Sequence, residues 1–339
     1  MAEKGYILRV LRNASFSRMK GAIDAVHAKC GKPKVVIFFD MVWCALRYGA
    51  GYYDYQVFNF YNLNAAQRST FVTRVISKKF NEFMNDEEYM HFFDNKDEFC
   101  TLFKDYLGRE VLLMEKSTKE EVLSFLSKRE QVFCKLKDKE CGHGCERLNT
   151  ADFESLDAMY DYLVKQGFCT IEDNIVQHPA LQKLYPNAVN SMRIITVLDA
   201  QGESHLLYVV QKMGLNGSII DNNCLFTPVD PETGKIKYPA HSGDTTLGII
   251  YHEHPNTHVP LQGYEIPYAK KAVEMCLEAA KKVPQVRYVG WDVATTPNGP
   301  AIIEGNTYTA HDFWQLPPHT LDKIGMLPKI KEYVPEFKY

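Results

Sequence analysis

The sequence predicts an α+β fold, with a mainly helical region at residues 1–110 and a mixed strand and helix region at 111–339. In the first region, apolar residues such as Ile76, Phe80 and Phe83 recur at the spacing of an amphipathic helix. After about residue 110, short β-branched runs alternate with clusters of Gly, Pro and Asn, which is typical of strands joined by turns. Helices are too few for a regular strand–helix alternation, so the pattern favours α+β over a doubly wound sheet.

The elements are expected in the following order. Three helices are expected in the first region. The first begins at Ser15 or Ser17, the second runs from about Ala65 to about residue 84, and the third begins near Asp97. The expected strands of the second region are residues 111–115, 131–137, 191–198, 205–213, 286–295 and 300–306, and its expected helices are 152–167 and 267–282.

Composition limits the class of protein. Hydrophobic residues make up 45% of the chain and charged residues 24%, which is ordinary for a globular protein with a core. The net charge of −3 gives no overall attraction for nucleic acid, so we expect no nucleic-acid partner. The nine cysteines are odd in number and scattered, which indicates reduced thiols. With no secretory signal and no run of about 20 apolar residues, the sequence predicts a cytoplasmic protein.

The first 34 residues carry an excess of positive charge, with eight Lys or Arg against two acidic residues. A basic amphipathic helix can lie on an anionic membrane surface. A solvated helix face explains the same pattern, and this is the interpretation that the sequence favours.

A hairpin near the C-terminus carries the clearest site signal. Two apolar strands flank the turn residues 297–300, with Asp292 in the first strand and Glu304 and Asn306 in the second. Carboxylate and amide oxygens suit Mg²⁺, which proteins usually hold with one or two carboxylates plus nucleotide phosphates. Glu304 and Asn306 are two positions apart, so they share a strand face. The three residues together predict a magnesium site. A single acidic residue would instead be explained by a position on the solvent-exposed face of the hairpin.

The register of this hairpin decides whether Asp292 and Glu304 can bind one ion. A two-residue turn of Asn298 and Gly299 would send the two carboxylates to opposite faces. We therefore expect a three-residue turn, 297–299, with Gly299 in the left-handed position of a G1 bulge. The side chains expected on the opposite, core-facing side are Trp291, Val293 and Ile303.

A second candidate site follows a predicted strand that delivers Lys135. The polar loop after it contains Gly142, His143 and Gly144. Glycines let backbone N–H groups approach phosphate oxygens, and a lysine supplies a mobile positive charge. The G-x-x-x-x-G-K-[ST] order of a Walker loop is absent, and a plain hairpin loop is the alternative.

Two further segments place polar groups beside apolar strands. Residues 168–179 end in a polar stretch with Glu172 and Asn174, which would present polar groups to an adenine edge or form a simple loop. Arg193 and Lys212 interrupt two apolar strands. A cation in such a strand is costly unless it meets an anion, so polyphosphate or an acidic substrate is one explanation and a snorkelling side chain is the other.

The order of these segments resembles the ATP-grasp superfamily, and within it the sugar-transfer-associated branch related to alpha-L-glutamate ligases. The specific part is G-W-D-V-A at 290–294 followed by I-I-E-G-N at 302–306, and residues 38–63 fit the same branch. The resemblance implies a two-lobed ATP-grasp fold after the helical region, with lobes at about 111–180 and 181–339.

The resemblance also implies an ATP- and Mg²⁺-dependent enzyme that activates a carboxylate as an acyl phosphate before an amine or other nucleophile attacks. A place in polysaccharide or natural-product biosynthesis follows from the branch. Alternatives are a kinase acting on a sugar-like hydroxyl and a non-catalytic nucleotide-binding protein. The implied roles are Lys135, Gly142, His143, Gly144, Glu172 and Asn174 for ATP, Asp292, Glu304 and Asn306 for Mg²⁺, and Arg193 and Lys212 for catalysis.

Overall fold

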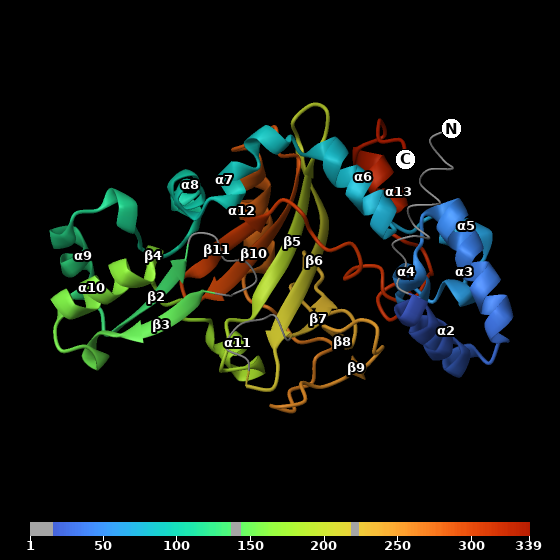
Figure 1. Ribbon diagram of the computed structural model, residues 1–339, viewed down its shortest axis with the longest axis horizontal. Helices are drawn as coiled ribbons and strands as arrows, with labels where there is room; N and C mark the ends of the chain where they lie inside the picture. The colour runs from blue at the N-terminus through green and yellow to red at the C-terminus, as the bar shows by residue number, and fades with distance from the viewer. Residues whose placement is uncertain (1–15, 137–143, 218–223) are drawn as a thin grey trace. The chain divides into compact units, whose positions relative to one another are not determined.

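The computed structural model describes residues 16–136, 144–217 and 224–339 (Figure 1). Its internal contacts divide the chain into two compact units. The first, called here the helical unit, combines the chain up to Phe83 with Asp244–Ile250 and Ala310–Tyr339. The second, the two-sheet unit, combines Met84–Gly243 and Tyr251–Thr309.

The helical unit forms where the sequence has helical periodicity, but one predicted helix is divided. Its helices are α2 (Phe16–Cys30), α3 (Lys34–Tyr48), α4 (Tyr52–Val57), α5 (Ala65–Arg68), α6 (Arg74–Met84, ending at the boundary) and α13 (Leu327–Tyr333). The single helix expected from Ala65 is wrong, because the chain leaves the helix between α5 and α6. There Gln315 binds both backbone groups of Val72, with N···Oε1 at 2.8 Å and Nε2···O at 3.0 Å. A side chain thus replaces the helical hydrogen bonds of this residue.

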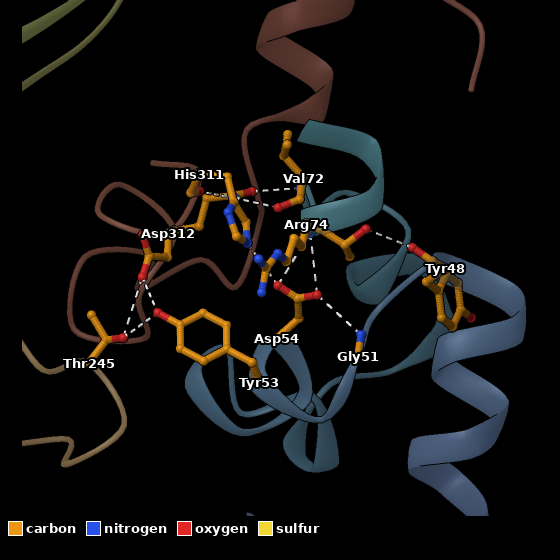
Figure 2. A network of polar contacts seen from close by, with 11 residues as sticks. Tyr48, Gly51, Tyr53, Asp54, Val72, Arg74, Thr245, His311 and Asp312 are labelled. Carbon is orange, nitrogen blue, oxygen red and sulfur yellow. Dashed lines mark hydrogen bonds and ion pairs between the residues drawn. The ribbon is translucent and has the colours of Figure 1, made fainter. Parts of the chain in front are cut away.

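A buried polar network joins the distant segments of the helical unit (Figure 2). Asp54, only 1% exposed, accepts hydrogen bonds from the backbone N–H groups of Gly51 and Arg74 and contacts His311 Nε2 at 2.8 Å. Next to it, the Tyr53 hydroxyl lies 2.6 Å from Thr245 Oγ1 and donates a hydrogen bond to Asp312 Oδ2 (Figure 2). The network explains why residues 244–250 and 310–339 belong with the N-terminal helices.

The smaller sheet of the two-sheet unit is antiparallel, with strand order β1-β4-β2-β3. Its strands are β1 (Val111–Leu113), β2 (Gln131–Leu136), β3 (Cys145–Asn149) and β4 (Phe168–Asp173). Two helices, α9 (Lys119–Leu126) and α10 (Leu156–Gln166), lie beside this sheet (Figure 1). They bury Leu126 and Leu163 in a core shared with Val132 and Ile171 of the sheet. Buried residues alternate along the first part of β2, at Val132 and Cys134, so one face of the sheet joins this core.

The larger sheet has seven strands in the order β11-β10-β5-β6-β7-β8-β9. They are β5 (Ser191–Leu198), β6 (Ser204–Gly214), β7 (Cys224–Pro228), β8 (Ala240–Ser242), β9 (Ile250–Tyr251), β10 (Tyr288–Thr296) and β11 (Gly299–Asn306). Helix α12 (Ala269–Ala280) packs small buried residues, including Ala272 and Cys276, into the main core with Ile194 and Val293. A short helix, α11 (Pro179–Leu184), follows β4. The predicted α+β class, with a helical N-terminal region, is confirmed.

Two helices before residue 110 belong to the two-sheet unit. Helices α7 (His91–Asp94) and α8 (Lys96–Leu102) contribute Phe93 and Phe99, and Phe103 follows α8. Phe93 and Phe103 pack on Trp291 of β10, with ring centroids 5.8 and 5.3 Å away. The expected boundary near residue 110 therefore lies inside this unit, because aromatic packing joins these helices to the larger sheet.

Candidate active site

The hairpin of β10 and β11 sets Asp292 directly opposite Glu304, as the shared-ion hypothesis requires. The expected three-residue turn is wrong, because Thr296 pairs with Gly299 and leaves only two residues in the turn. A β-bulge compensates. Val293 pairs with Ile302 while Asp292 pairs with Glu304, so one extra residue lies in β11 between the two pairs. The facing carboxylates are thus produced by a bulge within the strand rather than by an odd turn.

The bulge also changes which residue of β11 enters the core. Trp291 and Val293 are buried, as expected. Ile302, however, is fully buried and takes the place predicted for Ile303, which is only half-buried. The extra residue lies at position 303, so the regular in–out alternation that placed Ile303 in the core does not hold there.

Asp292 is a buried acid held by two cations. It is 5% exposed and lies opposite Arg193 on β5, whose guanidinium contacts both carboxylate oxygens, with Nη2···Oδ2 at 2.8 Å. Lys212 Nζ on β6 lies 3.7 Å from Oδ2. Burial alone would raise the pKa of Asp292, but Arg193 and Lys212 lower it to about 2. The predicted catalytic pair Arg193 and Lys212 is therefore brought together with the predicted metal ligand.

Glu304 completes a carboxylate pair with Asp292. Loss of surrounding water and the charge of Asp292 raise the pKa of Glu304, and the charges of Lys135 and Arg193 oppose this rise. Asn306 lies beside it, with Nδ2 3.5 Å from Glu304 Oε1 and 3.3 Å from the carbonyl oxygen of Gly290. Two carboxylates that repel each other form a site that a cation would stabilise.

This donor set fits Mg²⁺ bound jointly with phosphates. Asp292, Glu304 and Asn306 offer two carboxylates and one amide, all oxygen donors. Within the described ranges, no group of three or more His, Cys, Asp or Glu side chains is placed to hold a metal ion. Mg²⁺ seldom relies on a cage made only of protein groups and commonly takes one or two carboxylates plus nucleotide oxygens.

On the smaller sheet, Lys135 pairs with Glu172 instead of standing alone. Lys135 Nζ lies 2.7 Å from Glu172 Oε1, and the Glu172 side chain is only 2% exposed. Arg109 Nε binds the other oxygen at 2.8 Å. Burial raises the pKa of Glu172, but the charges of Lys135 and Arg109 dominate and lower it to about 2. Glu172 thus holds Lys135 in place, while its expected contact with adenine or ribose stays a prediction.

Arg109 is a site residue that the sequence analysis missed. Besides Glu172, its guanidinium binds the carbonyl oxygen of Ile302, with Nη1···O at 2.8 Å, next to the bulge in β11. It therefore connects the two sheets. The sequence offered one signal for it, the glycine at position 108 just before Arg109. The structure explains this glycine, because Gly108 has φ +60° and a Cβ atom there would come within 2.8 Å of the Ala301 Cβ.

The remaining predicted nucleotide contacts are only partly described. Gly142 and His143 lie outside the described residues. Gly144 has φ +77°, and its carbonyl oxygen accepts a hydrogen bond from Leu136 N at 2.9 Å. Asn174 Nδ2 donates to Gln131 Oε1 at 3.1 Å. Their contacts with a nucleotide remain predictions.

Comparison with known families agrees with these features. The chain matches the model of the sugar-transfer associated ATP-grasp family over residues 132–322 and belongs to that family. The match begins in β2 just before Lys135 and includes Glu172, Arg193, Asp292 and Glu304.

Solved structures that match this chain do so at low sequence identity. One is the ATP-grasp ligase PsnB complexed with minimal precursor, at 14% identity, covering 74% of this chain and 64% of that chain, with a TM-score of 0.41. Another is an ADP complex of purK, N5-carboxyaminoimidazole ribonucleotide synthetase, at 11% identity, 65% and 46% coverage and a TM-score of 0.40. D-alanyl-alanine synthetase A from Vibrio cholerae has 13% identity, 71% and 60% coverage and a TM-score of 0.40. The chain spans less than two thirds of each of these proteins, and no curated protein matches it.

Proposed function

We propose that the protein is an Mg²⁺-dependent ATP-grasp ligase that activates a carboxylate as an acyl phosphate for attack by an amine or other nucleophile. The observation that carries the proposal is the Asp292–Glu304 pair with Arg193 and Lys212 beside it. Membership of the sugar-transfer associated family supports ATP as the nucleotide and a role in polysaccharide or natural-product biosynthesis.

Each group has a role consistent with its surroundings. Asp292, Glu304 and Asn306 would hold Mg²⁺, which when bound neutralises phosphate charge and orients the phosphates. Lys135, fixed by Glu172, would contact the phosphate oxygens. Gly142, His143, Gly144 and Asn174 would complete the nucleotide contacts.

Arg193 has a second role that follows from its contact with Asp292. In the structure its guanidinium occupies both oxygens of this carboxylate. A cation bound to the same oxygens would compete with Arg193 and repel it, since both carry positive charge. The guanidinium would then be available to an anion, and with Lys212 it would stabilise the charge of an acyl phosphate.

A ligase suits this set of residues better than a kinase. A carboxylate substrate is already ionised, so its attack on a phosphate requires cations that hold it and no base. A kinase acting on a sugar-like hydroxyl commonly uses a positioned aspartate as the base. Asp292 is a poor candidate for that base, because its pKa is lowered to about 2 and both its oxygens are bound by Arg193.

Oxygen tracing distinguishes these functions. The protein would be incubated with ATP, Mg²⁺ and pools of ¹⁸O-labelled carboxylates and amines, with mass detection of products and phosphate. A ligase transfers one ¹⁸O atom from the carboxylate to the released phosphate. A phosphorylated sugar without label transfer would establish a kinase instead. ATP binding without turnover on any acceptor would favour the non-catalytic alternative, and Asp292→Asn serves as the inactive control.

A further inference from the structure

Helix α3 exposes a continuous apolar face. Its members, called here the α3 apolar face, are Val35 (60% exposed), Val36 (50%), Phe39 (65%), Trp43 (57%) and Leu46 (55%). At 100° per residue these side chains fall within one side of the helix. The opposite side is also apolar and is buried, through Ile37, Met41 and Cys44. The helix therefore has a core-facing side and an equally apolar side that no described part of the chain covers.

Such a face differs from single exposed apolar residues, which are common on any protein. A contiguous apolar patch usually marks a surface that binds a protein or a membrane. In α3 it combines two large aromatic side chains with three aliphatic ones along a 15-residue helix. Across the described ranges, no helix is both long enough and apolar enough to cross a bilayer.

The charge around α3 identifies the kind of partner. Residues 16–48 contain six Lys or Arg and two Asp, a net charge of +4, whereas the whole chain carries −3. Lys29, Lys32, Lys34 and Arg47 are exposed at the ends of α2 and α3. Both acids already have partners: Asp24 lies 2.6 Å from Lys34 Nζ, and Asp40 is bound by Arg68 at 2.7 Å. Because Asp24 balances Lys34, the positive charge beside the two ends of α3 comes from Lys29, Lys32 and Arg47.

We propose that the α3 apolar face docks on an anionic lipid surface. Phe39 and Trp43 would enter the boundary between headgroups and acyl chains, and the neighbouring Lys and Arg side chains would contact lipid phosphates. Tryptophan is enriched at this boundary, because its ring has an apolar body and a polar N–H group. A second copy of the chain fits less well, since pairing two α3 faces would bring their cations together.

This proposal revises the sequence-based preference for a solvated basic face. Basic residues alone would suit a helix surrounded by water. The structure adds a neighbouring helix whose exposed side is apolar, and this feature needs an apolar partner. Docking does not depend on the proposed ligase activity, so each hypothesis can fail without the other.

Tryptophan fluorescence of the full chain provides a direct test. Of the three tryptophans, Trp291 is 0% and Trp314 3% exposed, while Trp43 is 57% exposed. The protein would be mixed with vesicles of phosphatidylcholine containing phosphatidylglycerol, or of phosphatidylcholine alone. We expect a blue shift of the emission and cosedimentation with the anionic vesicles only, both weakened by added salt. Trp43→Phe should remove the shift and leave most of the cosedimentation.

Matched variants test the two components. Phe39→Gln should weaken vesicle binding about tenfold or more, because an apolar ring no longer leaves water. Leu321→Gln, at a residue 74% exposed elsewhere in the helical unit, should have no effect. Arg47→Glu should weaken binding at least about fivefold, while Lys165→Glu on the exposed surface of α10 should not.

Three outcomes would overturn the proposal. The first is the absence of any shift or cosedimentation with anionic vesicles. The second is equal vesicle binding by the wild type and Phe39→Gln. The third is a lipid-independent blue shift that grows with protein concentration, accompanied by dimer formation in sedimentation velocity, which would assign the face to a second copy.

Discussion

Lys135 and Glu172 lie diagonally across neighbouring strands, with Nζ 2.7 Å from Oε1. Phe133 is the residue that pairs directly with Glu172, so Lys135 stands two positions further along the same face of β2. Arg109 binds the second oxygen of Glu172. A buried acid thus fixes the direction of the lysine that is proposed to contact ATP phosphates, before any nucleotide binds.

Lys135→Ala is expected to weaken binding of Mg²⁺–ATP and to abolish turnover. Removing one partner of a desolvated charged contact typically costs about 2–5 kcal/mol. Binding would be measured by calorimetry and folding by circular dichroism, with Lys165→Ala as an exposed lysine control. Unchanged ATP affinity and turnover in a folded Lys135→Ala protein would refute the assignment of this lysine.

Arg109→Met is expected to destabilise the protein by about 3–5 kcal/mol, because it leaves a buried carboxylate with one of its two cations. Urea unfolding would measure the loss. Adding Glu172→Gln to Arg109→Met should restore part of the stability, since the uncompensated charge is removed. If the two substitutions were simply additive, the proposed coupling between these side chains would be absent.

The ion pair of Glu172 predicts a specific dependence of stability on pH. Its pKa of about 2 in the folded protein lies below the ordinary value of 4.5. Because the folded-state pKa is lowered, the stabilisation is fully present above about pH 4.5 and is lost as the pH falls towards 2. The difference corresponds to about 3 kcal/mol of unfolding free energy.

Urea unfolding at about pH 6 and about pH 3 would check this expectation. Glu172→Gln should lose about 2 kcal/mol less stability than the wild type between these two pH values, because the stabilisation is only partly lost at pH 3. Glu154→Gln, at an exposed acid, should behave like the wild type. Equal acid sensitivity of Glu172→Gln and the wild type would contradict the buried ion pair.

Arg193→Met is expected to strengthen binding of a divalent cation, by about tenfold, while reducing turnover. The guanidinium occupies the Asp292 oxygens that the cation would use, so its removal ends the competition. Binding of Mn²⁺ would be followed by electron paramagnetic resonance, with Arg147→Met as an exposed arginine control. Weaker or unchanged Mn²⁺ binding would show that Arg193 and the cation do not compete.

Tyr53→Phe tests how the helical unit holds its distant segments. The Tyr53 hydroxyl bonds to Thr245 and Asp312, which lie 192 and 259 positions away in the chain. Removing it leaves a buried carboxylate with one donor fewer, so we expect a loss of about 1–3 kcal/mol in thermal or urea unfolding. Tyr52→Phe, at the adjacent half-buried tyrosine, should change stability much less.

The sequence by itself determined several local elements and identified several charged residues of the proposed site. The β-branched run 191–198 coincides with β5, because alternating side chains suit a strand wherever it packs. Arg193 and Lys212 stood out because a cation within an apolar strand is costly unless it meets an anion, and Asp292 and Glu304 because their oxygens suit Mg²⁺. Periodicity and the cost of burying charge are properties of short segments, so a single sequence reveals them.

Tertiary structure decided the features that depend on distant partners. The bulge in β11 arises because Ile302 enters the core while Glu304 stays opposite Asp292. The sequence of the turn alone does not predict this bulge. Arg109 reaches Glu172 across 63 positions and Ile302 across 193. Such contacts form only when folding brings the two sheets together. The local sequence around Arg109 is compatible with many partners, and the packing of the sheets determines which carboxylate and which carbonyl group lie within its reach.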